Sequence, residues 1–331
     1  MRADSTVQHI SNGQLPPELE IQELVNEAYN LYKTDQGGHN ASHYPALKRV
    51  ARDLFGLCVV TVEGKTYSAG DIEHEFTIMS VAKPFTFALV TQELGIAEAR
   101  AKLGLNATGL PFNSMMGIEL QPDRLNNPMV NAGAIAAVSL VPGKTGDEKW
   151  QFILDKLSQF AGRNLKLNDE VYASASASNF RNRAIANLMY DNQRLYADPA
   201  ETVDVYTKQS SVDVNVKDLA IMAATLADGG VNPVTHQQVL DPDSCRFALA
   251  VMATAGLYET SGDWLVDIGL PGKSGVGGGI ITSAPGKGGL GTFSPPLDAA
   301  GNSVRGQLAT RFLSTHMGLN LFASKPEVEV R

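Results

Sequence analysis

Strand-like patterns lie near both ends of this chain, and helical patterns occupy the long stretch between them. Near the start, Leu54–Val62 is a short run rich in β-formers, and a Gly-Lys turn leads from it to Thr66–Ser68. Near the end, Val276–Ala284 and Leu290–Ser294 flank the turn-forming residues 285–289. Each pair is typical of a β-hairpin. Together the two pairs predict one discontinuous α/β domain that is built from both ends of the chain.

Apolar residues recur at helical spacing through the other segments. Such segments are Glu18–Tyr32, Trp150–Phe160, Asn182–Met189, Val216–Leu226 and, as a last amphipathic helix, about Val304–Leu319. We expect an α/β (α+β) fold in which residues 20–79 and 247–320 form an antiparallel sheet flanked by helices. Residues 80–246 are expected to form an inserted helical part. Clefts commonly form at such a junction.

The composition is that of an ordinary globular chain, and it argues against several classes of partner. The 331 residues carry a net charge of −8 without a basic run, which disfavours nucleic acid or an anionic membrane as the main partner. No stretch reaches the roughly 20 apolar residues of a membrane span, and Met1–Gly13 lacks the apolar core of a signal peptide. Cys58 and Cys245 lie in apolar surroundings and are expected to be buried free thiols. These features predict a cytoplasmic protein.

Ser80 and Lys83 stand at the beginning of an apolar stretch that reads as a helix. Residues three apart lie on the same face of a helix, so the lysine amine can reach the serine hydroxyl and activate it as a nucleophile. A helix N-terminus disfavours a nearby ammonium, which lowers the lysine pKa, and it favours negative charge on an attacked carbonyl oxygen. The pattern is short enough to occur about once by chance in a chain of this length. A capping serine followed by a solvated lysine is the simpler alternative.

Several longer segments resemble one family, the serine-dependent glutaminases of bacteria and animal mitochondria. The segment Asn127–Ile135, NPMVNAGAI, is identical to a signature of that family. The other matching segments are Arg181–Asn182, Tyr206, Gly256–Glu259, Gly269–Val276, Ser294–Asp298 and Gly301–Ser303. They occur in family order, and the resemblance covers roughly residues 20–320, which we treat as a single catalytic unit.

The resemblance implies a β-lactamase/transpeptidase-like fold and a defined reaction, the hydrolysis of the L-glutamine side-chain amide through an acyl-serine. It implies that Ser80 is the nucleophile, Lys83 its base and Tyr258 the proton shuttle to the leaving ammonia. The backbone N–H groups of Ser80 and Val276 would form the oxyanion hole. The implied substrate-holding residues are Asn131, Asn182, Tyr206 and His43. The family uses no metal and no organic cofactor, and its members commonly form homodimers or homotetramers.

Three positions depart from the family pattern. His43 stands in the place of a pocket tyrosine, with Tyr44 shifted by one, and Met79 replaces a common glutamine. Ala175 stands where the family has a glutamate that pairs with the substrate α-ammonium. Loss of a partner from a buried charge pair costs about 2–5 kcal/mol. We therefore hypothesise that the amino end of the substrate is recognised differently, and that an amide without a free α-amine, or a larger one, fits this pocket better.

Simpler interpretations stand beside these assignments. Tyr258 is also compatible with a core tyrosine, Asn131 with a turn residue, and His43 with a surface loop. Tyr206 and Asn182 lie in helical segments where helix packing would explain them nearly as well. The Glu73–Glu75 segment, Glu-His-Glu, has too few ligands for a metal site and is expected to be a solvated turn. A β-lactamase or peptidoglycan hydrolase, and a catalytically weak binding protein, are the alternative functions.

Overall fold

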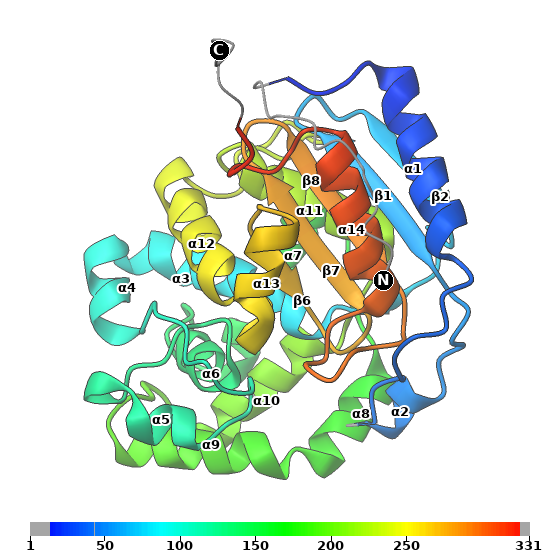
Figure 1. Cartoon of the computed structure of the whole chain (residues 1–331). Coiled ribbons are helices and arrows are strands. Elements are labelled where there is room, and N and C mark those ends of the chain that lie inside the picture. The colour runs from blue at the N-terminus through cyan, green and yellow to red at the C-terminus, as the bar shows by residue number, and fades with distance from the viewer. Residues whose placement is uncertain (1–13, 43, 325–331) are drawn as a thin grey trace, which may run out of the picture.

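The computed structural model describes residues 14–42 and 44–324 of the chain. A five-stranded antiparallel sheet, in the order β2-β1-β8-β7-β6, lies at its centre. The strands are β1 (Gly56–Thr61), β2 (Thr66–Gly70), β6 (Gly272–Ser274), β7 (Gly279–Ala284) and β8 (Gly288–Phe293). Both predicted hairpins are confirmed, as β1–β2 and β7–β8. The pairing of β1 with β8 joins the two ends of the chain in one sheet (Figure 1).

The strand expected to begin at Val276 begins at Gly279 instead, so that part of the prediction is wrong. Residues 275–278 form a tight turn between β6 and β7, in which the Gly278 N–H donates to the Gly275 carbonyl oxygen at 2.9 Å. Gly278 has a φ of +98°, a conformation that glycine adopts at little cost. Val276 is therefore a turn residue, and the glycines around it provide the backbone freedom that the turn requires.

Successive side chains of the sheet point to opposite faces, and helices cover each face. Leu57 of β1 belongs to one apolar cluster and Cys58 to a second one on the other face. The helices that supply these clusters are α1 (Glu18–Tyr32) and α14 (Val304–His316) for the first, and α11 (Val216–Ala227) for the second. In Figure 1, α14 lies in front of the sheet and α11 behind it.

Helix α11 lies very close to β8 because β8 presents glycines to it. A Cβ atom at Gly289 would lie 2.2 Å from the Ala224 backbone nitrogen, and one at Gly291 would lie 2.4 Å from the Val216 carbonyl oxygen. In sequence α11 falls within residues 80–246, yet in space it covers the sheet. We propose that the chain divides into an α/β part and an inserted helical part according to sequence position. Helix α11 belongs to the inserted part by sequence and packs on the sheet of the α/β part, so it joins the two.

The remaining helices surround two that are buried along most of their length, α3 (Lys83–Leu94) and α6 (Asn131–Ser139). The others are α2 (Pro45–Lys48), α4 (Ile96–Lys102), α5 (Met116–Leu120), α7 (Gly146–Ala161), α8 (Asp169–Ser178), α9 (Phe180–Asp191), α10 (Pro199–Ser210), α12 (Pro242–Ala255) and α13 (Ser261–Asp267). Side chains cap the N-termini of α7, α8, α10, α11, α12 and α14. The five predicted helices are confirmed as α1, α7, α9, α11 and α14.

A second, three-stranded sheet leads the chain into the Ser80 region. Its strands are β3 (Phe76–Thr77), β5 (Val212–Val214) and β4 (Lys166–Leu167), in the order β3-β5-β4. Cys58 and Cys245 are buried free thiols, as predicted. Within residues 14–42 and 44–324, no helix has the length and apolar character needed to cross a membrane.

Candidate active site

Ser80 lies on a short 3-10 turn, η1 (Met79–Ala82), that continues directly into α3. The Lys83 N–H donates to the Ser80 carbonyl oxygen, so the two residues are one helical turn apart, as the sequence predicts. Met79, just before Ser80, has a φ of +47°, a left-handed conformation that is unfavourable for a residue other than glycine. Strained backbone of this kind gathers at functional sites, where the surrounding structure maintains it.

Lys83 is buried and has no carboxylate against it among the described residues. Its Nζ donates to the Asn131 side-chain oxygen at 2.7 Å and lies 3.4 Å from the Met129 carbonyl oxygen. Burial lowers the pKa of Lys83 to about 7. A lowered pKa was expected, but from the helix N-terminus. Removal from water is its cause, because α3 lies in the interior of the molecule.

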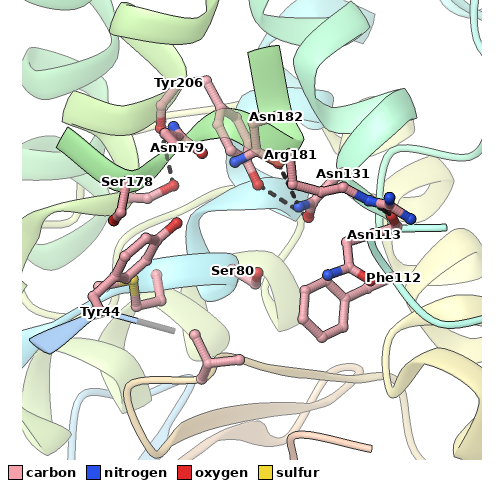
Figure 2. Close-up of a pocket in the computed structure, with 13 residues that line it drawn as sticks. Tyr44, Ser80, Phe112, Asn113, Asn131, Ser178, Asn179, Arg181, Asn182 and Tyr206 are labelled. Carbon is pink, nitrogen blue, oxygen red and sulfur yellow. Dashed lines mark hydrogen bonds between the residues drawn. The ribbon is translucent and has the colours of Figure 1, made fainter. Parts of the chain in front are cut away.

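Asn131 is hydrogen-bonded to three of the other predicted site residues. Its side-chain oxygen accepts hydrogen bonds from Lys83 and, at 3.2 Å, from the Tyr206 hydroxyl. Its amide nitrogen donates to the side-chain oxygen of Asn182 at 2.9 Å. These residues come from α3, α6, α9 and α10, and Figure 2 shows the side chains of Asn131, Asn182 and Tyr206 converging. The structure thus brings together residues that lie far apart in the sequence.

The NPMVNAGAI segment forms the turn before α6 and the first five residues of that helix. Asn127 accepts the Met129 N–H at 3.0 Å and donates to the Asn106 carbonyl oxygen at 2.8 Å, which fixes the turn. A Cβ atom at Gly133 would lie 2.1 Å from the Asn127 carbonyl oxygen. Glycine is therefore required for α6 to begin where it does, and this start places Asn131 beside Lys83.

Tyr258 is buried on the short turn η3 (Tyr258–Thr260), with a φ of +59°. Its hydroxyl donates to the Ser274 carbonyl oxygen at 3.2 Å, and the Ser80 side chain lies close enough to lower its pKa. Burial raises the pKa of Tyr258 to about 12, so its phenol is protonated at neutral pH. The ring of Phe112 contacts it, with ring centroids 4.8 Å apart. A protonated donor therefore lies beside the candidate nucleophile.

The Gly275–Gly278 turn lies against the backbone that precedes Ser80. A Cβ atom at Gly275 would lie 3.2 Å from the Ser80 nitrogen, and one at Gly277 would lie 2.6 Å from the Thr77 carbonyl oxygen. Across residues 14–42 and 44–324, no acceptor contacts the backbone N–H of Ser80 or of Val276. Two unpaired donors thus occur on adjacent backbone segments, an arrangement that suits a developing oxyanion.

These groups surround a pocket with a volume of about 120 Å³. The residues that line it are Tyr44, Met79, Ser80, Phe112, Asn113, Asn131, Ser178, Asn179, Arg181, Asn182, Tyr206, Ser210 and Val276 (Figure 2). Among these lining residues Arg181 carries the only formal charge, and its Nε donates to the Asn113 carbonyl oxygen at 2.9 Å. No carboxylate lines the pocket in the part of the chain that the structure describes.

Five of the predicted site residues line this pocket, namely Ser80, Asn131, Asn182, Tyr206 and Val276. Lys83 and Tyr258 do not line the pocket, but Lys83 is hydrogen-bonded to the lining residue Asn131 and Tyr258 contacts the ring of the lining residue Phe112. His43 lies outside the described residues, while Tyr44 lines the pocket. Ala175 is buried on α8. Phe112, Asn113, Ser178, Asn179 and Ser210 carried no catalytic signal in the sequence. In the described residues, no group of His, Cys, Asp or Glu is placed to hold a metal ion.

Comparisons with known proteins agree with the resemblance found in the sequence. The glutaminase family matches residues 38–322. Glutaminase 2 of Yersinia pestis is 58% identical over 98% of this chain and 95% of its own length. The solved structure of a probable glutaminase, ybaS, superposes with a TM-score of 0.92 at 44% identity, over 93% of this chain and all of the other.

A crystal structure of a protein called Mglu in its glutamate form superposes with a TM-score of 0.87 at 36% identity, over 92% of this chain and 71% of the other. The fold predicted from the sequence, a β-lactamase-like arrangement with an antiparallel sheet and many helices, is confirmed by these neighbours. The family match and the identity to the Yersinia protein extend over most of the sequence. This chain belongs to the glutaminase family.

Proposed function

We propose that the protein hydrolyses the side-chain amide of L-glutamine to glutamate and ammonia through an acyl-Ser80 intermediate. The names of its relatives support glutamine as the substrate over an amide that lacks a free α-amine, and support an enzyme over a binding protein. The observation that carries the mechanism is the placement of Ser80 in the pocket, one turn from a buried lysine whose pKa is about 7. Such an amine is partly neutral at neutral pH and serves as a base.

In the first step the Lys83 amine takes the proton from Ser80 Oγ, which attacks the side-chain carbonyl carbon of glutamine. The C=O electron pair moves onto oxygen, and the N–H groups of Ser80 and Val276 hold the resulting oxyanion. When the intermediate collapses, the C–N bond breaks and Tyr258 gives its phenolic proton to the departing nitrogen. Ammonia leaves and Lys83 returns its proton to the Tyr258 phenolate. A water molecule then attacks the carbonyl carbon of the acyl-Ser80, and one of its protons is passed through the same groups to the departing Ser80 Oγ. This step releases glutamate and restores the Ser80 hydroxyl.

The amino-acid end of the substrate is held by neutral groups and one guanidinium. We assign Asn131, Asn182 and Tyr206 to this task because they line the pocket and hold one another in position. Arg181 attracts the substrate α-carboxylate, since no lining carboxylate opposes its charge. The substrate α-ammonium donates hydrogen bonds only to the oxygens of side-chain amides and hydroxyls, which do not neutralise its charge.

Removing the Tyr258 hydroxyl should slow the chemical step without weakening the binding of glutamine. We expect Tyr258→Phe to lower kcat for glutamine by roughly 100- to 10,000-fold, the usual range for loss of a general acid, with little change in KM. The ring, and with it the contact to Phe112, is retained. Steady-state kinetics of ammonia release give both constants. A Phe variant with wild-type kcat would remove Tyr258 from the mechanism.

A carboxylate introduced on α8 at position 175, where the family has a glutamate, should improve the recognition of glutamine. Ala175 is one helical turn before Ser178, which lines the pocket, so a longer side chain at 175 projects from the same face. An ionised partner for the α-ammonium contributes about 1.5–3 kcal/mol, and we expect Ala175→Glu to lower KM for glutamine by roughly 10-fold or more. Ala175→Gln is the uncharged control of equal size. N-acetyl-L-glutamine, which has no ammonium, should gain nothing. Equal KM values for the Glu and Gln variants would contradict this assignment.

We also propose that the chain works in the cytoplasm as a homodimer or homotetramer. Large apolar side chains that are exposed on α5 and α9 support an association of copies: Met116, Leu120, Phe180 and Tyr190. The mass of the purified protein in light scattering gives the number of copies.

Ammonia release from L-glutamine by the purified protein tests the proposed function. The assay should be run beside N-acetyl-L-glutamine and a β-lactam. Glutamine is expected to be the best substrate of the three. Preferential hydrolysis of the β-lactam, or no ammonia from any amide, would overturn the proposal.

A further inference from the structure

A second cavity lies beside the pocket and shares part of its wall. It has a volume of about 630 Å³ and is lined by residues 38–42, 111–113, 259 and 297–301. Phe112 and Asn113 line both the pocket and this outer cavity. Figure 2 shows Phe112 at the right-hand edge of the pocket, with Ser80 to its left. The steps proposed above make no use of the outer cavity.

The shared wall is on the side of the pocket where the leaving nitrogen departs. Tyr258, which gives its proton to that nitrogen, packs its ring on Phe112 with the centroids 4.8 Å apart. The next residue along the chain, Glu259, lines the outer cavity. Burial, and after it the charge of Glu259, raise the pKa of Tyr258, so the carboxylate is close to the phenol. A group attached to the leaving nitrogen therefore lies next to the outer cavity.

Gly301 lines the outer cavity at a point where two residues of the pocket come near it. A Cβ atom at Gly301 would lie 3.5 Å from Val276 Cγ1 and 3.7 Å from Phe112 Cε1, in van der Waals contact with both. The glycine thus leaves a gap between them, close to the N–H group that we assign to the oxyanion. The pocket itself measures only about 120 Å³. A substituent on the leaving nitrogen has to extend through this gap into the outer cavity.

The outer cavity differs from the pocket in its charge. In the described part of the chain its lining contains the carboxylates of Glu259 and Asp298, one histidine, His39, and no lysine or arginine. The pocket has the opposite character, since Arg181 carries its only formal charge. A cation is therefore attracted to the outer cavity, and the α-carboxylate of a glutamyl group to the pocket.

Glu259 is the carboxylate that remains available to a ligand. Asp298 stabilises its own loop, because its two oxygens accept hydrogen bonds from Ala300, Asn302 and Gln307, each at 2.9 Å. Glu259 is exposed, and no lysine, arginine or histidine that the structure describes forms an ion pair with it. A cationic ligand in the outer cavity would give this carboxylate a partner.

We propose that the outer cavity is a subsite for the leaving amine, and that the protein also hydrolyses γ-glutamyl amides of primary amines. The best of these should carry a second, cationic amino group. The glutamyl part lies in the pocket as glutamine does, the substituent extends past Phe112, and its ammonium pairs with Glu259.

The chemistry is that of glutamine hydrolysis with a different leaving group. Ser80 Oγ bonds to the side-chain carbonyl carbon, the C–N bond breaks, and the departing nitrogen takes the phenolic proton of Tyr258. The products are the free amine and, after water attacks the acyl-Ser80, glutamate. The inference rests on the proposed function, because both use the same acyl-enzyme.

The test compares L-glutamine with the γ-glutamyl amides of diaminobutane and of pentylamine. The two substituents have equal length, and only that of diaminobutane ends in an ammonium. We expect the wild type to release glutamate from both. The kcat/KM for the diaminobutane amide should be roughly 3- to 5-fold above that for the pentylamine amide, the contribution of one partly exposed ion pair. This preference should decrease in concentrated salt.

Glu259→Gln removes the charge and keeps the size of the side chain. The readout is the ratio of kcat/KM for the two substituted amides, so an effect of the substitution on Tyr258 acts on both and cancels. The preference for the diaminobutane amide should disappear. Asp263→Asn is the matched control, because Asp263 lies nearby in the sequence, on α13, but does not line the outer cavity. This variant should keep the wild-type ratio.

The outcomes separate this inference from the proposed function. Hydrolysis of glutamine without release of amine from either substituted amide would overturn the inference and leave the proposed function in place. Hydrolysis of the substituted amides without that of glutamine would support the subsite and overturn the proposed function. No hydrolysis of any of the amides would overturn both. A diaminobutane preference that is absent from the wild type, persists in Glu259→Gln or is lost equally in Asp263→Asn would contradict the role of Glu259.

Discussion

Ser80→Ala is expected to reduce ammonia release from L-glutamine by roughly 10,000-fold or more, the scale observed when a catalytic serine nucleophile is removed. The reason is chemical, because without Oγ no acyl-enzyme forms and only uncatalysed attack by water remains. Removal of one hydroxyl leaves the lining of the pocket in place, so the affinity for glutamate should change little. Stopped-time ammonia assays give the rate, and calorimetry gives the affinity.

Ser178→Ala is the matched control for this variant. Ser178 also lines the pocket, but its hydroxyl donates to the Ser174 carbonyl oxygen within α8. This variant is expected to retain kcat within a few-fold. If Ser80→Ala kept more than a few per cent of the wild-type rate, or if Ser178→Ala were the inactive variant, the nucleophile would have been assigned to the wrong serine.

Lys83→Met should lower kcat/KM by roughly 100- to 10,000-fold, because the base that activates Ser80 is lost. The pH profile of the wild type should identify the same group. Burial lowers the pKa of Lys83 to about 7, and the active form is the neutral amine. Activity is therefore complete above that pH and falls tenfold per unit below it, as the amine takes up a proton.

In Lys83→Met this limb should disappear along with the activity. A Lys149→Met control should keep both, since Lys149 is buried on α7, donates to the Ser139 carbonyl oxygen and does not line the pocket. A wild-type profile that is flat between about pH 5.5 and 8.5 would contradict a base of this pKa. So would a Lys83→Met variant that retained the limb, because another group would then be titrating.

Much of the fold followed from local patterns in the sequence. The hairpins β1–β2 and β7–β8 and the five predicted helices were found from their periodicity and turn residues. The start of β7 was not, because the turn at Val276 depends on where Gly275 and Gly277 meet the backbone before Ser80. That contact joins residues almost 200 positions apart, and no local pattern contains it.

Part of the candidate site could likewise be predicted from the sequence, and part of it could not. The spacing of Ser80 and Lys83 and the family motifs located the residues that we assign to the chemistry. The cause of the lowered Lys83 pKa could not be found from spacing, since it is the burial of α3 by other helices. Phe112 and Ser210 line the pocket only because distant loops and helices converge. Glu259 lay within a recognised motif, but the cavity that it lines became evident only in three dimensions.

The most direct test of the mechanism is to trap the covalent intermediate. The enzyme should be mixed with L-glutamine, quenched in acid within milliseconds, digested and analysed by mass spectrometry. We predict a glutamyl ester on the peptide that contains Ser80, absent from Ser80→Ala. Turnover of glutamine without any adduct on Ser80, or an adduct on a different residue, would contradict acyl transfer through Ser80.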